Sequence, residues 1–229
     1  WDQQRRFVSD ASHELKTPLA VILANAQILE AVEGVPEDAR RWARSTAEEA
    51  KHMKGLVEDL LTLARADEQR ASGERASTER VDLSALVDGC ALEFDAVAFE
   101  RGCSIESSIE PGLSVVGDSS QVGRLVRTLL DNATKYAARG TEVRVSLARE
   151  GRRCRLAVTN LGDVIAPEDL EHLFERFYRT DRARERQPQG GFGLGLAIAR
   201  SIAEAHGGTI GATSSAEAGT TFTVLLPLA

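Results

Sequence analysis

Gln189–Ala199 reads QGGFGLGLAIA and places four glycines within six residues directly before an apolar helical run. Glycines at the start of a helix let backbone N–H groups approach phosphate oxygens, and the helix dipole favours negative charge there. The run does not follow a strand in a βαβ unit, and the chain has no G-x-x-x-x-G-K-[ST] motif, so the two common nucleotide fingerprints are excluded. The charged segment Arg179–Gln189 in front of it has no large apolar side chain. The sequence therefore predicts a phosphate-binding glycine segment with a mobile lid before it.

Around this stretch, from residue 81 to residue 229, apolar periods typical of strands and of helices alternate. The expected elements are a strand at 81–83, a helix at 84–101, a strand at 103–109, a helix at 118–138, a hairpin of strands 143–148 and 153–159, a short helix at 168–179, a helix from Leu194, and strands at 209–214 and 221–226. This order predicts an α+β sandwich, with helices on one face of a largely antiparallel sheet.

The N-terminal part has a different pattern, in which apolar residues recur at intervals of seven, as at Val8, Leu15, Ile22 and Leu29. After a break at residues 33–36 the repeat resumes over residues 39–64. The pattern predicts an antiparallel helical hairpin over residues 1–66, with its buried seam at Leu15 and Ile22. Because two helices leave apolar surface exposed, we expect a homodimer that completes a four-helix bundle. Residues 67–80 are polar and aperiodic, which predicts a linker to a second domain over residues 81–229.

The composition excludes several classes of protein. Among 229 residues, 28 Lys and Arg stand against 35 Asp and Glu, and the net charge of -7 disfavours nucleic-acid binding through phosphate neutralisation. Cys90, Cys103 and Cys154 lie far apart without CxxC or CxxH neighbours, so we expect neither a disulfide framework nor a zinc site. No apolar run approaches the roughly 18 residues of a spanning helix, and residues 1–6 are too polar for a signal peptide. We expect a cytoplasmic segment that makes no membrane contact itself.

The first candidate for chemistry is His13, which the heptad places at an outward-facing position. Glu14 adjoins it, Thr17 follows at i+4, and Pro18 stands inside the helix, where proline costs about 3 kcal/mol. Glu14 could accept the proton that an imidazole nitrogen loses as it becomes a nucleophile, and Thr17 could position a water. An ordinary surface histidine beside a tolerated kink is the structural alternative.

The second candidate group lies on the helix predicted at residues 118–138. Asn132 offers a hard carbonyl oxygen suited to Mg²⁺, Lys135 a cation for phosphate, and Tyr136 a flat face for a purine. On spacing alone, the polar side of a plain amphipathic helix explains the same residues.

Taken together, these segments resemble the catalytic core of a bacterial sensor histidine kinase of the HisKA type. Phe7–Leu19 (FVSDASHELKTPL) resembles the family's H box, Asp131–Tyr136 (DNATKY) its N box, Leu173–Arg179 (LFERFYR) its F box, Gly191–Gly195 its glycine box and Gly219–Phe222 its last, weaker glycine motif. The resemblance covers nearly the whole chain. It implies a dimerisation and phosphoacceptor hairpin followed by an ATPase sandwich of the Bergerat (GHKL) fold, which gyrase, mismatch-repair and heat-shock chaperone ATPases share.

The resemblance also implies roles for individual residues. His13 would be phosphorylated from ATP with Glu14 as its acid/base neighbour, and the phosphoryl group would pass to an aspartate of a response-regulator receiver domain. Glu14 with Thr17 would support dephosphorylation of that partner. In the ATPase domain the implied residues are Asn132 for Mg²⁺, Lys135 for phosphate, Tyr136 for the base, Arg179 near the terminal phosphate, and Asn160, Gly162, Gly191, Gly193, Leu194, Gly195 and Thr221 for further nucleotide contacts. By the same resemblance, we expect the chain to be the cytoplasmic portion of a membrane-bound sensor.

Three positions depart from the family's pattern. Thr128 stands where many relatives have an asparagine, four residues before the metal-binding one, and its hydroxyl could help hold Mg²⁺ through water. Asn160 replaces the aspartate that reads adenine, and Val164 replaces the second glycine of the D-x-G-x-G box. A β-branched residue at Val164 predicts a loop without a positive φ there. Because an amide can donate as well as accept, our hypothesis is that Asn160 discriminates less against guanine than a carboxylate would.

Two alternatives remain at this point. A degenerate kinase that acts only as a phosphatase or a dimeric scaffold would explain Asn160 and Val164. A standalone ATPase of the same fold would explain the nucleotide motifs but would leave His13 without a role. We favour the active histidine kinase, because the H box and the nucleotide motifs occur in one chain.

Overall fold

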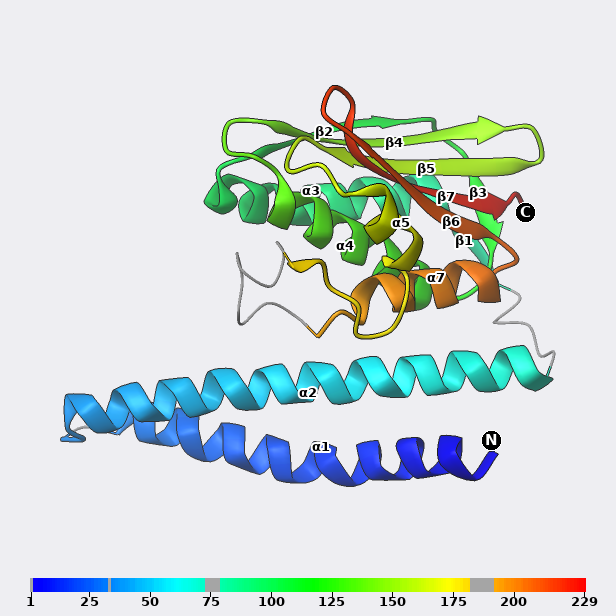
Figure 1. The fold of residues 1–229 in the computed structure, drawn as a ribbon. Helices are drawn as coiled ribbons and strands as arrows, with labels where there is room; N and C mark the ends of the chain where they lie inside the picture. Colours follow the sequence, from blue (N-terminus) through cyan, green and yellow to red (C-terminus); the bar gives the residue numbers. More distant parts are fainter. Residues whose placement is uncertain (1, 33, 73–78, 182–191) are drawn as a thin grey trace.

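The computed structural model describes residues 2–32, 34–72, 79–181 and 192–229, with the backbone alone for residues 2–14, 16 and 65–72. A helical hairpin lies below a sheet-and-helix domain (Figure 1). Within the described residues, no helix has both the length and the apolar character needed to cross a bilayer.

The hairpin consists of α1 (Asp2–Ala31), which contains Pro18, and α2 (Glu37–Ser72). The predicted pair of helices is confirmed, but the predicted linker is wrong at its start, because α2 continues from Ala66 to Ser72. The reason is local: residues 66–72 are mostly Ala, Glu, Gln and Arg, which favour helix, and Gly73 is the next glycine.

The buried seam inside the hairpin also differs from the prediction. Leu19 and Ala26 of α1 are 4% and 3% exposed, and Leu19 packs with Val57 and Leu61 of α2. Leu15 and Ile22, predicted for this seam, are 46% and 43% exposed in the single chain. The apolar strip of α1 is wider than one helix can cover, so one side of it packs against α2 and the other stays exposed.

The second domain contains two sheets and four helices in its described part. In chain order the elements are β1 (Arg80–Asp82), α3 (Leu83–Arg101), β2 (Ser104–Ile109), β3 (Ser114–Val116), α4 (Ser119–Tyr136), β4 (Glu142–Glu150), β5 (Arg153–Asn160), α5 (Pro167–His172), α7 (Gly195–Ala205), β6 (Thr209–Ser215) and β7 (Gly219–Pro227). The main sheet has the order β2-β4-β5-β7-β6 and is antiparallel except for the parallel pair β2–β4, and β1 pairs with β3.

This arrangement confirms the predicted α+β sandwich. Helices α3, α4 and α7 cover one face of the sheet (Figure 1), where alternate residues such as Val145, Leu156 and Phe222 meet the apolar stripe of α4. Two differences concern short elements: β3 was not predicted, and the helix predicted at 168–179 ends at His172. Asp118 caps α4, since its carboxylate accepts hydrogen bonds from Ser120 N at 2.8 Å and Gln121 N at 3.1 Å.

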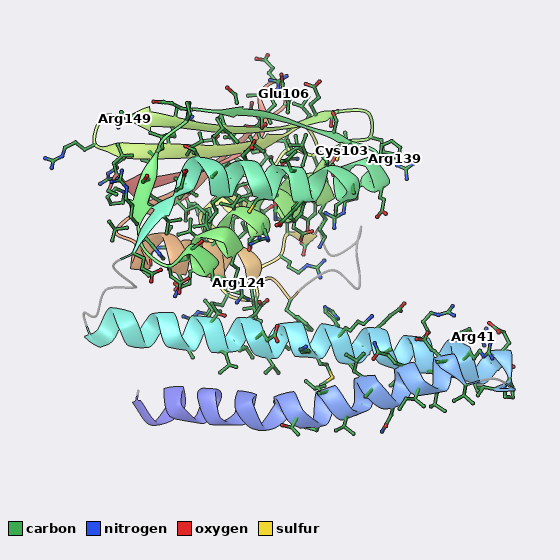
Figure 2. The ribbon with its side chains drawn as sticks, turned by 180° about the vertical axis from the view of Figure 1, so that it is seen from behind. Arg41, Cys103, Glu106, Arg124, Arg139 and Arg149 are labelled. Atoms are coloured by element: carbon green, nitrogen blue, oxygen red, sulfur yellow. The ribbon has the colours of Figure 1, made fainter. Side chains whose placement is uncertain are left out.

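Helix α2 has a second contact face, which joins the hairpin to the sandwich. Leu56 and Leu60 pack against the core of the second domain, to which α7 also belongs. Arg124 of α4 donates a hydrogen bond to Thr62 Oγ1 at 2.5 Å and forms an ion pair with Asp59. Figure 2 shows Arg124 where the second domain meets α2. In both views α2 lies between α1 and the second domain.

Candidate functional site

A cavity of about 1120 Å³ opens between α4, the loop after β5, the segment after α5 and the start of α7. It brings together most of the residues predicted from the sequence, although they come from distant parts of the chain: Thr128, Asn132, Lys135, Tyr136, Asn160, Arg179, Gly193, Leu194 and Gly195. Asp59 of α2 lines the same cavity, so the hairpin forms part of its wall.

Other predicted residues lie elsewhere. The lining residues of β7 are Thr220 and Phe222, not Thr221, because neighbours on a strand point to opposite faces; the hydroxyl of Thr221 lies 2.9 Å from that of Thr159 instead. Thr17 is exposed on α1. The side chains of His13 and Glu14 lie outside the described part of the chain, as does Gly191.

Gly162 does not line the cavity but fixes the loop that does. A Cβ atom on Gly162 would lie 2.2 Å from the carbonyl oxygen of Tyr136, so only glycine allows the loop to rest on the last turn of α4. A backbone hydrogen bond from Ala138 N to Leu161 O, at 2.7 Å, supports this contact. Val164 follows without a positive φ, as predicted; Phe177 is the one non-glycine residue of the described chain that has one.

The polar residues of α4 are held by α3. Arg101 donates to Asp131 Oδ1 at 2.9 Å and to Thr134 Oγ1 at 2.7 Å, which fixes the turn that presents Asn132 and Lys135. Burial lowers the pKa of the Lys135 ammonium below its usual range; the Asp131 carboxylate opposes this shift, and the Arg179 and Arg101 cations add to it. An anionic ligand beside Lys135 would oppose this shift and favour the charged ammonium.

The glycine segment is bound to the F box by its backbone. Phe177 N donates to Gly193 O at 3.0 Å, and a Cβ on Gly193, which has φ 74°, would lie 2.6 Å from Tyr178 O. Tyr178 in turn donates to Asp169 Oδ1 at 2.5 Å, which raises the pKa of Tyr178 to about 12. These contacts join the segments on either side of the predicted lid, of which residues 182–189 lie outside the described part of the chain.

Three residues of the site were not predicted. Asp59 and Arg124 form the ion pair between α2 and α4, and the ring of His52 on α2 stacks on that of Phe192 in the glycine segment, with 4.3 Å between centroids. No local pattern could have found them, because each partner lies more than 60 residues away from the other.

The side chains of the cavity suit a nucleoside triphosphate. Lys135 and Arg179 supply positive charge for phosphates. The amide of Asn132 supplies an oxygen that Mg²⁺ accepts, and within the described residues no cluster of three or more His, Cys, Asp or Glu forms a metal site of its own. On the sheet side, the buried Asn160 amide and Phe222 offer a polar group and an apolar surface for a base.

Known proteins share both parts of this architecture. The family model for the His Kinase A (phospho-acceptor) domain matches residues 3–69, and the model for the histidine kinase-, DNA gyrase B- and HSP90-like ATPase matches residues 117–229. Sensor protein DltS of Streptococcus agalactiae serotype III (strain NEM316) is 37% identical over 208 residues, which cover 91% of this chain and 50% of that protein.

Solved structures agree with these matches. Full-length ShkA in complex with AMPPNP aligns with a TM-score of 0.82 and 28% identity, over 98% of this chain and 46% of that one. The mycobacterial sensor histidine kinase MprB aligns with a TM-score of 0.57 and 32% identity, over 66% of this chain and 97% of that one. The chain belongs to the sensor histidine kinase family. It spans about half the length of the curated relatives it matches.

Replacing Gly162 with alanine tests the contact between the loop and α4. We expect Gly162→Ala to weaken ATP binding by about 100-fold, because the added methyl group displaces the loop from Tyr136 and misplaces the cavity wall. Gly211→Ala is the matched control, since a Cβ there meets nothing within 4 Å. Titration calorimetry on both variants measures the effect, and equal affinities would show that the contact does not shape the site.

The lowered pKa of Lys135 predicts a pH dependence of ATP affinity. Only the protonated ammonium of Lys135 attracts phosphate. Because its pKa lies below the ordinary value of 10.5, Lys135 loses its proton at a lower pH than a free lysine does. The affinity for ATP therefore falls as the pH rises towards 10.5. We expect a loss of about tenfold in the parent protein and a flat profile in Lys135→Arg, whose guanidinium stays charged. Tyr136 and Tyr178 have raised pKa values and stay neutral longer. A parallel alkaline decline in both proteins would contradict this role.

Proposed function

We propose that this chain transfers the γ-phosphoryl group of ATP to His13 and then to an aspartate on a response-regulator receiver domain. The hairpin over residues 1–66 would serve dimerisation and phosphotransfer, and residues 81–229 would bind ATP. The observation that carries the proposal is the cavity that gathers Asn132, Lys135 and Arg179 beside the glycine segment, in a chain whose α1 contains the H box. The AMPPNP complex of ShkA supports ATP as the ligand.

The proposed chemistry is a displacement at phosphorus. An imidazole nitrogen of His13 forms a bond to the γ-phosphorus, the bond from phosphorus to the bridging oxygen breaks, and ADP leaves with the electron pair. Glu14 takes the imidazole proton, while Lys135 and Arg179 stabilise the charge on the phosphate oxygens. Asn132, with Thr128 through water, would hold Mg²⁺, which when bound neutralises part of the phosphate charge.

The arrangement of the helices bears on how His13 reaches ATP. Helix α2 lies between α1 and the ATPase domain, and Arg124 fastens α4 to α2 through Asp59 and Thr62. Transfer therefore requires either that the ATPase domain leaves this position or that it serves the histidine of a second copy. We take the described arrangement as one in which the ATPase domain rests on α2.

Helix α1 also carries residues that suit hydrolysis of the phosphorylated partner. Thr17 is exposed on α1, one turn after His13, where a docked receiver domain can reach it. We propose that Glu14 and Thr17 activate and position the water that removes phosphate from the receiver aspartate. The net charge of -7 disfavours nucleic acid as a partner. We further propose that the chain is the cytoplasmic part of a membrane-bound sensor, as its resemblance implies.

Incubation with Mg·[γ-³²P]ATP tests the kinase activity. The parent protein should acquire acid-labile, base-stable label. His13→Gln should lose it, because no other histidine of the chain lies in a segment that resembles the H box. His172→Gln is the matched control, since His172 is exposed on α5 outside the cavity. ATP hydrolysis that survives in His13→Gln without labelling of the parent would favour a standalone ATPase, and binding of ATP without label would favour a degenerate kinase.

We also propose that the exposed strip of α1 forms the homodimer interface. Leu15, Ile22 and Leu29 are 43–50% exposed and lie at one heptad position. Ile22→Asp should produce monomers with unchanged helix content, because a charge in a four-helix interface is costly, whereas Ala24→Asp, also exposed but off the strip, should remain dimeric. Analytical ultracentrifugation decides the matter, and a dimer that survives Ile22→Asp would place the interface elsewhere.

A further inference from the structure

The cavity has two chemically different parts. The part formed by α4 and the F box carries Lys135 and Arg179, which match phosphates. The part formed by the sheet has Asn160 and Thr220, which are cross-strand partners on β5 and β7, next to the ring of Phe222. Charge places the phosphates in the first part, so the base of a bound nucleotide lies against the sheet, where Asn160 is the residue able to read its polar edge.

Asn160 and Thr220 differ in how they are held. The Thr220 hydroxyl lies 2.8 Å from Ser214 Oγ, which accepts a hydrogen bond from Ile165 N at 3.0 Å, so the protein already fixes Thr220. The Asn160 side chain is 3% exposed, lines the cavity, and has no hydrogen bond to any other residue that the structure describes. The amide therefore faces the cavity with its hydrogen-bonding groups available to a bound ligand.

The free amide can present either of its two groups to that ligand. Its carbonyl oxygen and its NH₂ group are similar in size, so rotation about the side chain exchanges them without breaking a protein hydrogen bond. Space for the rotation exists because residue 162 is glycine; a Cβ there would approach Asn160 Nδ2 to 3.2 Å. A carboxylate at this position could only accept, which would select a 6-amino purine and repel a 6-oxo purine.

We propose that Asn160 makes this a purine nucleoside triphosphate site that accepts both a 6-amino and a 6-oxo group. The amide oxygen accepts from the amine of adenine, and the amide NH₂ donates to the oxygen of guanine or hypoxanthine. The kinase would then use GTP as well as ATP. This inference rests on the proposed function and adds the class of phosphoryl donor to it.

Inosine triphosphate isolates the contact at C6, because it carries the 6-oxo group of guanine without the 2-amino group. Titration calorimetry of ATP, ITP and GTP against the parent protein and Asn160→Asp, with Mg²⁺ present, measures the selectivity. The ratio of dissociation constants is the readout, since the added charge of the aspartate acts equally on three ligands with the same triphosphate. The parent ratio alone tests the inference if the variant fails to fold.

We expect the parent to bind ITP within about tenfold of ATP, and Asn160→Asp to favour ATP by about 10–100-fold more than the parent does. If GTP binds as tightly as ITP, the result extends to guanine. If GTP binds much more weakly than ITP, the site accepts adenine and hypoxanthine but not guanine. A parent that binds ATP but rejects ITP, with the same ratio in Asn160→Asp, overturns the inference and leaves the proposed function intact. A parent that binds none of the three overturns both.

Discussion

The close approach of Gly162 to the carbonyl of Tyr136 is the constraint on which the site depends. It joins the loop after β5 to the last turn of α4, and so joins the sheet to the helix that presents Asn132 and Lys135. Without this contact, the polar residues of the sheet and the cations of α4 would not face one cavity. Val164 in the same loop has no left-handed backbone, so its β-branched side chain is accommodated without strain.

Much of the architecture could be predicted because it follows local periodicity. The amphipathic pattern of α4 and the alternation in β4 and β5 fix which side chains are buried, and the glycines mark the start of α7. The predictions that failed depended on which face of a strand or which side of a helix a residue occupies, and on contacts between residues far apart in the sequence. Thr221 differs from the lining residue Thr220 by one position, and one position on a strand moves a side chain to the opposite face. The apolar strip of α1 does not reveal which of its sides packs against α2 and which stays exposed.

The contacts between the hairpin and the second domain could not be predicted from the sequence for a different reason. From the sequence, Arg124 occupies a polar position on one amphipathic helix and Asp59 occupies a solvent-facing position on another. The two residues come together only in the folded chain. Burial raises the pKa of Asp59 although Arg124 lowers it, because the pair is partly withdrawn from water where the two domains meet. Helix α2 thereby does two things: it pairs with α1, and it forms part of the wall of the nucleotide cavity.

We propose that this cavity holds ATP with its base on the sheet and its phosphates on α4. A crystal structure of the protein with AMPPNP and Mg²⁺ would show the position of each part of the nucleotide. We predict the 6-amino group of adenine within hydrogen-bond distance of the Asn160 amide oxygen, and the triphosphate beside Asn132, Lys135 and Arg179. A nucleotide bound with its base away from Asn160, or at another surface of the molecule, would contradict the claim.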